Sequence, residues 1–214
     1  MIAIDNLTTP TSSQWEMIIM GMRNPMNSWD KSDSEWKVLN SNSVYIVGDD
    51  DLALMSKLRK AGTDHGKFMR MIPVYMDITA PLYWWKEFDT YKVGTVANSC
   101  STMHKIHTRP FTLNDFSTEH LTPENREVLM HTIDALNTAR NKYLETNDKN
   151  YWWQMIQLLP SSYNQLRTVM VNYEVLSNMY HSRKTHKLDE WRSFCNIIAT
   201  LPYSRLITGE GYEL

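Results

Sequence analysis

The sequence predicts an α+β fold in which helices pack on a small sheet. Helical patterns cover most of the chain after residue 40, whereas strand patterns are confined to short segments such as 43–47 and 67–78. Prolines at 81, 123 and 160 stand where helices begin or are separated. A chain with many helices and few strands belongs to the α+β class rather than to a doubly wound α/β fold.

Composition indicates one globular domain. The chain has 214 residues, of which 42% are hydrophobic and 21% charged, with a net charge of −2. There is no basic tract, no apolar stretch long enough to cross a bilayer and no secretory signal pattern, so we expect neither a nucleic-acid nor a membrane partner. Cys100 and Cys195 are too few for a disulfide framework or a metal cluster, which favours a reduced cytoplasmic location and no metal.

The first forty residues differ in composition from the rest. They are rich in Ser, Thr, Asn and Asp and carry three spaced tryptophans, Trp15, Trp29 and Trp36. We interpret residues 1–40 as an irregular arm whose aromatic rings dock on the body or on a neighbouring subunit, and residues 41–214 as the α+β domain.

The elements of that domain follow in order. Ser43–Val47 is a strand, Gly48 and the aspartates at 49–51 suit a turn and a helix N-terminus, and the helix ends near Gly62. Residues 67–78 are predicted to form a strand at an edge or a bulge because they contain Pro73.

The second half is predicted to be mainly helical. Pro81 opens a helix through YWWKEFDTY, residues 93–104 are a loop or short strand, and Pro123 opens a long helix to about residue 145. A short helix over WWQMIQLL precedes Pro160, and a last amphipathic helix containing Trp191 and Cys195 ends before Pro202.

The segment between these last two helices carries the main candidate site. If residues 166–183 form one helix, the side chains of Asn172, Met179 and Arg183 project within roughly 40° of each other around the helix axis. An apolar stripe would lie beside them, formed by Leu166, Val169, Met170, Tyr173, Leu176 and Tyr180. Such a helix could aim an amide and a guanidinium at one ligand, although a solvated polar face has the same pattern.

Three further segments are weaker candidates. Asp64-His65 could titrate near neutrality or donate to a ligand, but a surface turn has the same pattern. Asn98-Ser-Cys-Ser101 offers an amide, two hydroxyls and a thiol, with Cys100 either a nucleophile or a small buried residue. His186 and Glu190 stand four residues apart and suit half a metal site or, more simply, a salt bridge.

Taken in order, these segments resemble the flavin-dependent thymidylate synthases over roughly residues 43–202. GTDHGKFMRM resembles the family's acid-His pair before a Phe-containing strand. YKVGTVANSCSTM resembles its Arg-His-Arg-x-x-Ser-x-Asn-x-x-Ser-x-Arg motif, with Asn98 and Ser101 on the Asn and the second Ser. After Leu159-Pro160, NYEVLSNMYHSR resembles its helix Asn-x-Arg-x-x-x-Asn-x-x-x-Leu-Arg, and HKLDEWR resembles its His-Ala-Gln-x-Glu-Ile-Arg.

The chain departs from the family at several positive positions. Tyr91-Lys92-Val93 stands in place of Arg-His-Arg, Met103 in place of the closing Arg, and Glu174 in place of the helix Arg. Anionic ligands need cations or helix N-termini. Nearby cations that could substitute are Lys86, Lys92, His104, Lys105, Arg59 and Arg70.

The resemblance implies a homotetramer that converts dUMP to dTMP by reductive methylation, with FAD as cofactor and methylenetetrahydrofolate and NADPH as co-substrates. It implies that Arg183, which polarises the uracil ring, and Ser101 are the catalytic residues, and that Asn98, Ser101 and Arg183 contact the nucleotide. It assigns His65, Asn172 and Asn178 to the flavin, with Lys92 as a stand-in for a missing Arg. Two alternatives stay open: a catalytically degenerate homologue that binds a nucleotide or partner, and an enzyme acting on a different pyrimidine nucleotide.

Overall fold

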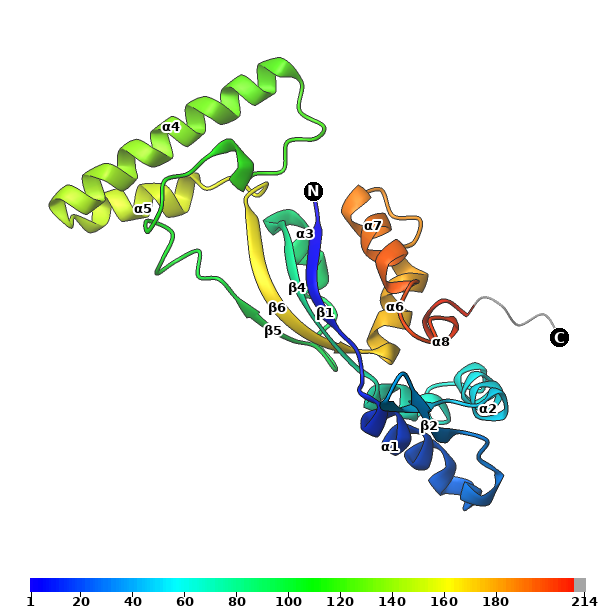
Figure 1. Ribbon diagram of the computed structural model, residues 1–214. Helices are drawn as coiled ribbons and strands as arrows, with labels where there is room; N and C mark the ends of the chain where they lie inside the picture. The colour runs from blue at the N-terminus through cyan, green and yellow to red at the C-terminus, as the bar shows by residue number, and fades with distance from the viewer. Residues whose placement is uncertain (210–214) are drawn as a thin grey trace. The chain divides into compact units, whose positions relative to one another are not determined.

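A computed structural model describes residues 1–209 and confirms the α+β class (Figure 1). The elements in chain order are β1 (Ala3–Thr8), α1 (Ser12–Arg23), η1 (Asn24–Met26), η2 (Trp29–Lys31), β2 (Glu35–Leu39), β3 (Asn42–Ile46), α2 (Asp49–Lys60), η3 (Gly66–Met71), β4 (Pro73–Pro81), α3 (Leu82–Phe88), β5 (Val96–Ser99), η4 (Leu113–Asp115), α4 (Pro123–Thr146), α5 (Lys149–Leu158), β6 (Asn164–Asn172), α6 (Tyr173–Arg183), α7 (Asp189–Ile198) and α8 (Arg205–Thr208), where η denotes a 3-10 helix. Among these residues, no helix combines the length and the apolar character needed to span a membrane.

The chain folds into two compact units. Unit 1 consists of Met1–Asp5, Asp77–Thr90 and Ala97–Thr168, and unit 2 consists of Asn6–Met76, Tyr91–Val96 and the chain from Val169 onward. One sheet has the strand order β1-β4-β6-β5, and the antiparallel hairpin of β2 and β3 forms a second. The chain passes from one unit to the other within β1, β4, β5 and β6, so both units contribute residues to these strands.

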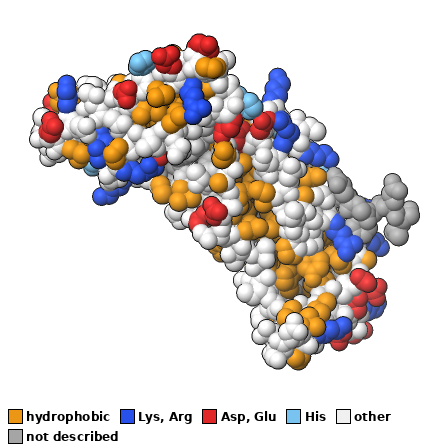
Figure 2. Space-filling view, turned by 45° about the horizontal axis from the view of Figure 1, so that its top comes forward, with side chains coloured by type: hydrophobic (Ala, Val, Ile, Leu, Met, Phe, Trp, Pro, Cys, Tyr) orange, Lys and Arg blue, Asp and Glu red, His pale blue; other side chains and the backbone are white. Residues whose placement is uncertain are grey.

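Unit 1 contains a helical hairpin, in which α4 and α5 lie side by side (Figure 1). As predicted, Pro123 opens α4; Thr122 caps it, and Asn147 closes it in the left-handed conformation. Apolar residues at helical spacing on α4 bury themselves against α5 and the loop before α4, and this core contains Leu129, Ile133, Leu136, Met155, Phe111 and Phe116. On the face drawn in Figure 2, basic, acidic and hydrophobic side chains are interspersed over this hairpin.

Helix α3 supplies the other buried aromatic group of unit 1. Trp84, Trp85 and Phe88 are each no more than 1% exposed, and their ring centroids lie 4.9 to 5.2 Å apart. The Trp85 indole donates to the carbonyl of Gln165, and the Arg167 guanidinium lies 4.2 Å from the centroid of the Trp85 ring. The YWW segment is therefore core and leaves little aromatic surface for a partner.

The expectation of an irregular arm over residues 1–40 is wrong, because this segment contains β1, α1 and β2. Thr11 and Gln14 form a capping box at the start of α1, since each side chain accepts from the other residue's backbone N–H. The apolar residues of α1 recur at positions 15, 18, 19 and 22 and are buried, which is the pattern of an amphipathic helix. Both signals are present in the sequence, but the polar composition of the segment masked them.

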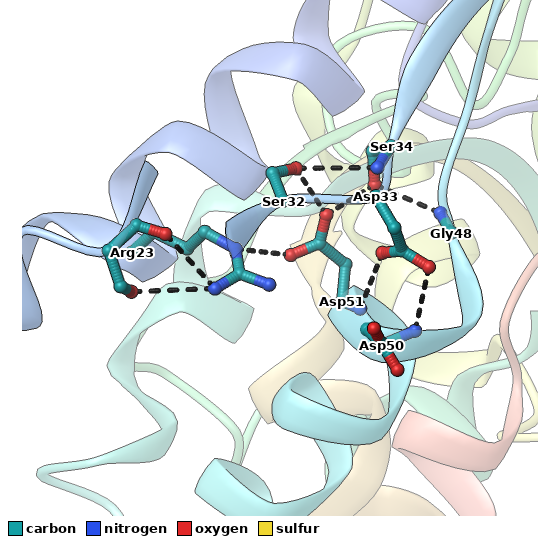
Figure 3. A network of polar contacts seen from close by, with 8 residues as sticks. Arg23, Ser32, Asp33, Ser34, Gly48, Asp50 and Asp51 are labelled. Carbon is teal, nitrogen blue, oxygen red and sulfur yellow. Dashed lines mark hydrogen bonds and ion pairs between the residues drawn. The ribbon is translucent and has the colours of Figure 1, made fainter. Parts of the chain in front are cut away.

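A network of polar contacts holds α2 to the segment before β2 (Figure 3). The Arg23 Nε donates to the Asp51 carboxylate at 2.5 Å, and both side chains are buried. Ser32 and Ser34 donate to the other Asp51 oxygen, each at 2.5 Å. The Asp51 carboxylate is thus paired and hydrogen-bonded, which a buried charge requires.

Asp33 caps α2 from outside the helix. Its two carboxylate oxygens accept from the backbone N–H groups of Asp50 and Asp51 at 2.9 and 3.0 Å. Gly48 is required beside it, because a Cβ there would lie 2.1 Å from the Asp33 carboxyl carbon. The N-terminus of α2 therefore receives its cap from a residue distant in sequence rather than from the aspartates at 49–51.

Two predicted elements are wrong in type. Residues 66–71 form the 3-10 helix η3 and not part of a strand. The strand begins at Pro73, because proline has no N–H to donate to a neighbouring strand and is tolerated at the first position. Residues 164–172 form β6 and not the first half of a helix. Val169 and Val171 are buried on either side of the half-buried Met170, and their β-branched side chains favour a strand. The predicted strand at 43–47 and the other predicted helices are confirmed, with small shifts at their ends.

Candidate functional site

The predicted site residues fall into two sets, one in each unit. Arg183, Asn172, Asn178, His65 and Lys92 belong to unit 2. Asn98 and Ser101 belong to unit 1, where Ser101 lines a cavity.

Arg183 ends α6 and lies between two aromatic rings. Its Nε donates to the hydroxyl of Tyr91 at 3.0 Å, and its guanidinium carbon lies 4.9 Å from the centroid of the Trp191 ring. The side chain is partly buried. A positive charge at a helix C-terminus is favoured by the helix dipole, and stacking on aromatic faces restricts the orientation of the guanidinium. The fold therefore holds Arg183 in place, as a positioned binding group requires.

Asn172 stands at the opposite end of α6 and caps it. Its side-chain oxygen accepts from the backbone N–H of Val175 at 3.0 Å, and the residue is 8% exposed. The expected Asn172, Met179 and Arg183 row on one helix is wrong, because the helix begins only after Asn172. The two ends of an eleven-residue helix are separated by roughly 16 Å, so these two groups can meet one ligand only if it is long.

The segment Tyr91–Val96 connects these two ends. Tyr91 contacts Arg183, and Gly94 lies against Asn172. Gly94 has a φ of +75°, and a Cβ there would lie 2.7 Å from the Asn172 Nδ2 and 3.2 Å from the Val175 Cγ2. Only glycine suits this position, for both conformation and space. Lys92 stands between these two contacts and is exposed.

The remaining flavin candidates are solvent-accessible. Asn178 is exposed in the middle of α6. His65 is exposed at the start of η3 and lines a cavity of about 240 Å³ together with Met22, Phe68 and Met71. The structure brings neither residue to Arg183 or Asn172 through a hydrogen bond within the described chain.

Two of the cations that could replace the missing arginines are already engaged. Arg70 forms an ion pair with Glu174 at 2.7 Å, so the acidic residue at a family Arg position is neutralised. Arg59 donates to the carbonyl of Leu206 at 2.6 Å and to the hydroxyl of Ser177 at 3.1 Å, and burial lowers its pKa. Both side chains fasten unit 2 internally.

Of the two cysteines and the candidate metal ligands, Cys100 lies in unit 1, whereas Cys195, His186 and Glu190 lie in unit 2. Over residues 1–209, no three His, Cys, Asp or Glu side chains converge as metal ligands. The His186 Nδ1 accepts from the backbone N–H of Leu188 at 3.2 Å. Cys195 is buried, which raises its pKa to about 11 and keeps the thiol protonated. Cys100 is exposed, and its backbone is held to β6 through a 2.9 Å bond from its N–H to the Leu166 carbonyl.

The unit 1 cavity has a volume of about 640 Å³ and contains charged groups that sequence reasoning did not combine. Ser101 lies in its wall, and its hydroxyl oxygen accepts from the N–H groups of Met103 and His104 at 3.3 and 2.8 Å. Lys105 and Arg109 also line it. Lys105 is among the nearby cations that the sequence offers as substitutes, whereas Arg109 belongs to no motif and carries no signal in the sequence. Asn98 is exposed on β5.

Comparison with known proteins identifies the fold. No family model matches the sequence, and no curated protein matches it. Among solved structures, the chain is similar to thymidylate synthase X (ThyX) from Helicobacter pylori with FAD and dUMP, at a TM-score of 0.67 and 17% identity, covering 97% of each chain. A second structure of ThyX from Helicobacter pylori, a flavin-dependent thymidylate synthase complexed with FAD and dUMP, gives 0.67 and 15% over 97% of this chain and 98% of that one. The chain has the ThyX fold.

Proposed function

We propose that this protein is a flavin-dependent enzyme of the thymidylate synthase type, which methylates dUMP to dTMP with methylenetetrahydrofolate as carbon donor and NADPH as reductant. The observation that carries the proposal is the shared fold over 97% of the chain with two ThyX structures that contain FAD and dUMP. The position of Arg183, held by Tyr91 and Trp191 at the end of α6, supports it.

The residues of unit 2 fit FAD through polar groups more than through charge. His65 and Asn178 are exposed, and the Asn172 amide lies beside Gly94. Lys92 is exposed and makes no side-chain hydrogen bond or ion pair within the described chain, so its charge is available to a phosphate. When bound, reduced FAD would supply the hydride of the reaction. Arg183 would bind the carbonyl edge of the uracil ring and stabilise negative charge there.

The second candidate is a degenerate homologue that binds a nucleotide without redox chemistry. The Arg70–Glu174 ion pair favours it, because it replaces a family arginine by a neutral pair. A relative that acts on another pyrimidine nucleotide is the third.

Reconstitution separates these possibilities. The purified protein is mixed with FAD and passed through a gel-filtration column, and dTMP is then assayed with dUMP, methylenetetrahydrofolate and NADPH. Co-eluting flavin together with dTMP formation supports the first candidate. If the protein binds a nucleotide but no flavin, the result supports the second candidate. If it binds flavin and turns over another pyrimidine nucleotide but not dUMP, the result supports the third.

We further propose a cytoplasmic homotetramer. Both cysteines are free, which suits a reducing compartment. The tryptophans left exposed, Trp29, Trp36 and Trp153, are between 41% and 44% accessible and are available to an interface.

A further inference from the structure

The hairpin of β2 and β3 belongs to unit 2, and within residues 1–209 no strand pairs with the outer edge of β2. Its two-residue turn at positions 40–41 has positive φ at both residues, and the register places Leu39 opposite Asn42 beside the turn. The pair that closes such a turn is hydrogen-bonded, and hydrogen-bonded and non-hydrogen-bonded pairs alternate along the strands. The backbone N–H and C=O groups of Trp36 and Val38 therefore point away from β3.

Apolar side chains lie along this open edge. All five residues of β2 are exposed; Trp36 and Val38, which share one face, are 41% and 76% exposed. The Trp36 indole donates to the Glu16 carboxylate of α1 at 3.0 Å, and its ring centroid lies 5.6 Å from that of Tyr45. Met20, one turn after Glu16 on α1, is 43% exposed and extends the apolar surface. A strand edge with exposed apolar side chains and no proline favours the addition of another strand.

The opposite face of β2 carries two charges of opposite sign. The Lys37 Nζ lies 3.0 Å from the Glu35 Oε1, and the two side chains are 50% and 63% exposed. A lysine on an edge strand usually discourages pairing, but here the acid two residues away leaves the strand without net charge. The charges therefore favour a partner strand that presents a lysine to Glu35 and an acid to Lys37.

A second copy of β2 meets this requirement in one register. Two antiparallel copies can be related by a two-fold axis at any of the three middle residues of β2. An axis at Lys37 places this lysine opposite itself, which is destabilising, and an axis at Val38 places Lys37 opposite Leu39. An axis at Trp36 places Glu35 of each copy opposite Lys37 of the other. These are non-hydrogen-bonded pairs, in which the side chains lie closest.

We propose that β2 pairs with β2 of a second copy of this chain, in antiparallel orientation, about a two-fold axis at Trp36. The inference rests on the proposed homo-oligomer and names the surface that joins two of its chains. The two Trp36 rings lie opposite each other with Met20 beside them, and aromatic residues and methionine are enriched at the centres of interfaces. The two hairpins form one four-stranded sheet, in which the outward backbone groups of Trp36 in both copies are paired.

Reversal of the charges in the whole protein tests the register, with sedimentation over a concentration series as the measurement. Glu35→Lys and Lys37→Glu each place like charges opposite one another at both sites. Each should raise the dissociation constant by about tenfold or more, so that the assembly has half the wild-type mass at concentrations where the wild type is assembled. An equimolar mixture of the two variants should recover the wild-type mass, because a chain with two acids then faces a chain with two lysines.

The recovery is specific to pairing between chains, since both variants lose the Lys37–Glu35 contact within the chain. The double variant Glu35→Lys/Lys37→Glu exchanges the two charges and should assemble as the wild type does. Asp30→Lys and Lys57→Glu reverse the same charges at exposed positions of unit 2 outside β2. These controls should assemble as the wild type does, alone and mixed, and urea denaturation checks that every variant is folded.

The failure of this interface is distinguishable from the failure of the proposed homo-oligomer. A wild type with the mass of one chain throughout the concentration series would overturn both. An assembled wild type whose mass neither single reversal at 35 or 37 changes would overturn the β2 interface alone. So would single variants that dissociate but do not recover when they are mixed.

Discussion

At the scale of the residue, the environment of Arg183 decides how its proposed role can be tested. A guanidinium has five N–H donors, and Tyr91 takes the one on Nε. The Trp191 ring beneath it fixes the plane of the group. A ligand would therefore meet a guanidinium whose orientation is already set by unit 2.

Arg183→Lys should preserve the fold and most flavin binding but should weaken dUMP binding. A Lys cannot reproduce a planar, multidentate contact, and the loss should be about 2–4 kcal/mol, by analogy with removal of an oxyanion-hole donor. Calorimetric titration of dUMP into both proteins measures it. Tyr91→Phe, which removes only the hydroxyl acceptor, should have a smaller effect in the same direction.

If Arg183 serves only a surface contact, the difference should stay below about 1 kcal/mol. Equal dUMP affinity and equal activity in the Lys variant would remove Arg183 from the site. Arg126→Lys on α4 provides the matched control, since Arg126 is exposed.

At the scale of the element, α6 is capped by Asn172, a residue that the family resemblance assigns to the flavin. The Asn172 oxygen satisfies the N–H of Val175, and its amide packs on Gly94. The two roles of this side chain use different atoms. The helix cap needs the side-chain oxygen of Asn172 as an acceptor, whereas a hydrogen bond donated to a ligand needs its NH₂ group.

Asn172→Ala should lower the free energy of unfolding by about 0.5–2 kcal/mol, the usual cost of losing an N-cap. Asn172→Asp should keep the cap, since a carboxylate oxygen can accept the same hydrogen bond. Urea denaturation measures both. Asn178→Ala, at an exposed position within α6, is the comparison and should cost little, because Ala favours helices.

The outcome also separates the two roles of Asn172. An Asp variant of wild-type stability that binds FAD less tightly would show that the amide contacts the flavin. An Ala variant as stable as the wild type would contradict the capping role.

The cap of α2 predicts a dependence of stability on pH. Burial alone would raise the pKa of Asp33, but hydrogen bonds from the backbone of Asp50 and Asp51 outweigh it and hold the pKa below its ordinary value. A lowered pKa in the folded state means that the ionised cap stabilises the fold above the ordinary aspartate pKa. That contribution is lost as the pH falls below about 4.

Asp33→Asn should therefore be less stable than the wild type at pH 7, and the difference should shrink toward pH 3. Urea denaturation across this range measures it, with Asp30→Asn on the exposed η2 as the charge-matched control. A difference that stayed constant with pH would refute the ionised cap.

At the scale of the whole molecule, the structure changes which aromatic residues are available to a partner. Trp15, Trp84 and Trp85 are no more than 6% exposed and belong to the core. Trp29 and Trp36 in unit 2 and Trp153 in unit 1 stay accessible. The expectation of an oligomer therefore depends on fewer rings than the sequence alone indicated.

Light scattering coupled to gel filtration should give about four times the mass of one chain at micromolar concentration, because exposed rings are stabilised when an interface removes them from water. The measurement is made with and without FAD. A mass equal to a single chain under both conditions would contradict the homotetramer.

The α+β class, most of the helices and the order of motifs that resembles flavin-dependent thymidylate synthases can be predicted from the amino-acid sequence alone. These depend on local signals, such as Pro123 at the start of α4 and the apolar spacing of α7, and local signals act between neighbours in the chain. The sequence alone does not determine that residues 164–172 form a strand, because an apolar run suits a helix or a buried strand equally until its partners are known. Three features arise only when the chain is folded: Arg70 neutralises Glu174, Asp33 caps α2, and Lys105 lines a cavity. Each of these depends on side chains from distant segments, which folding alone brings within hydrogen-bond distance.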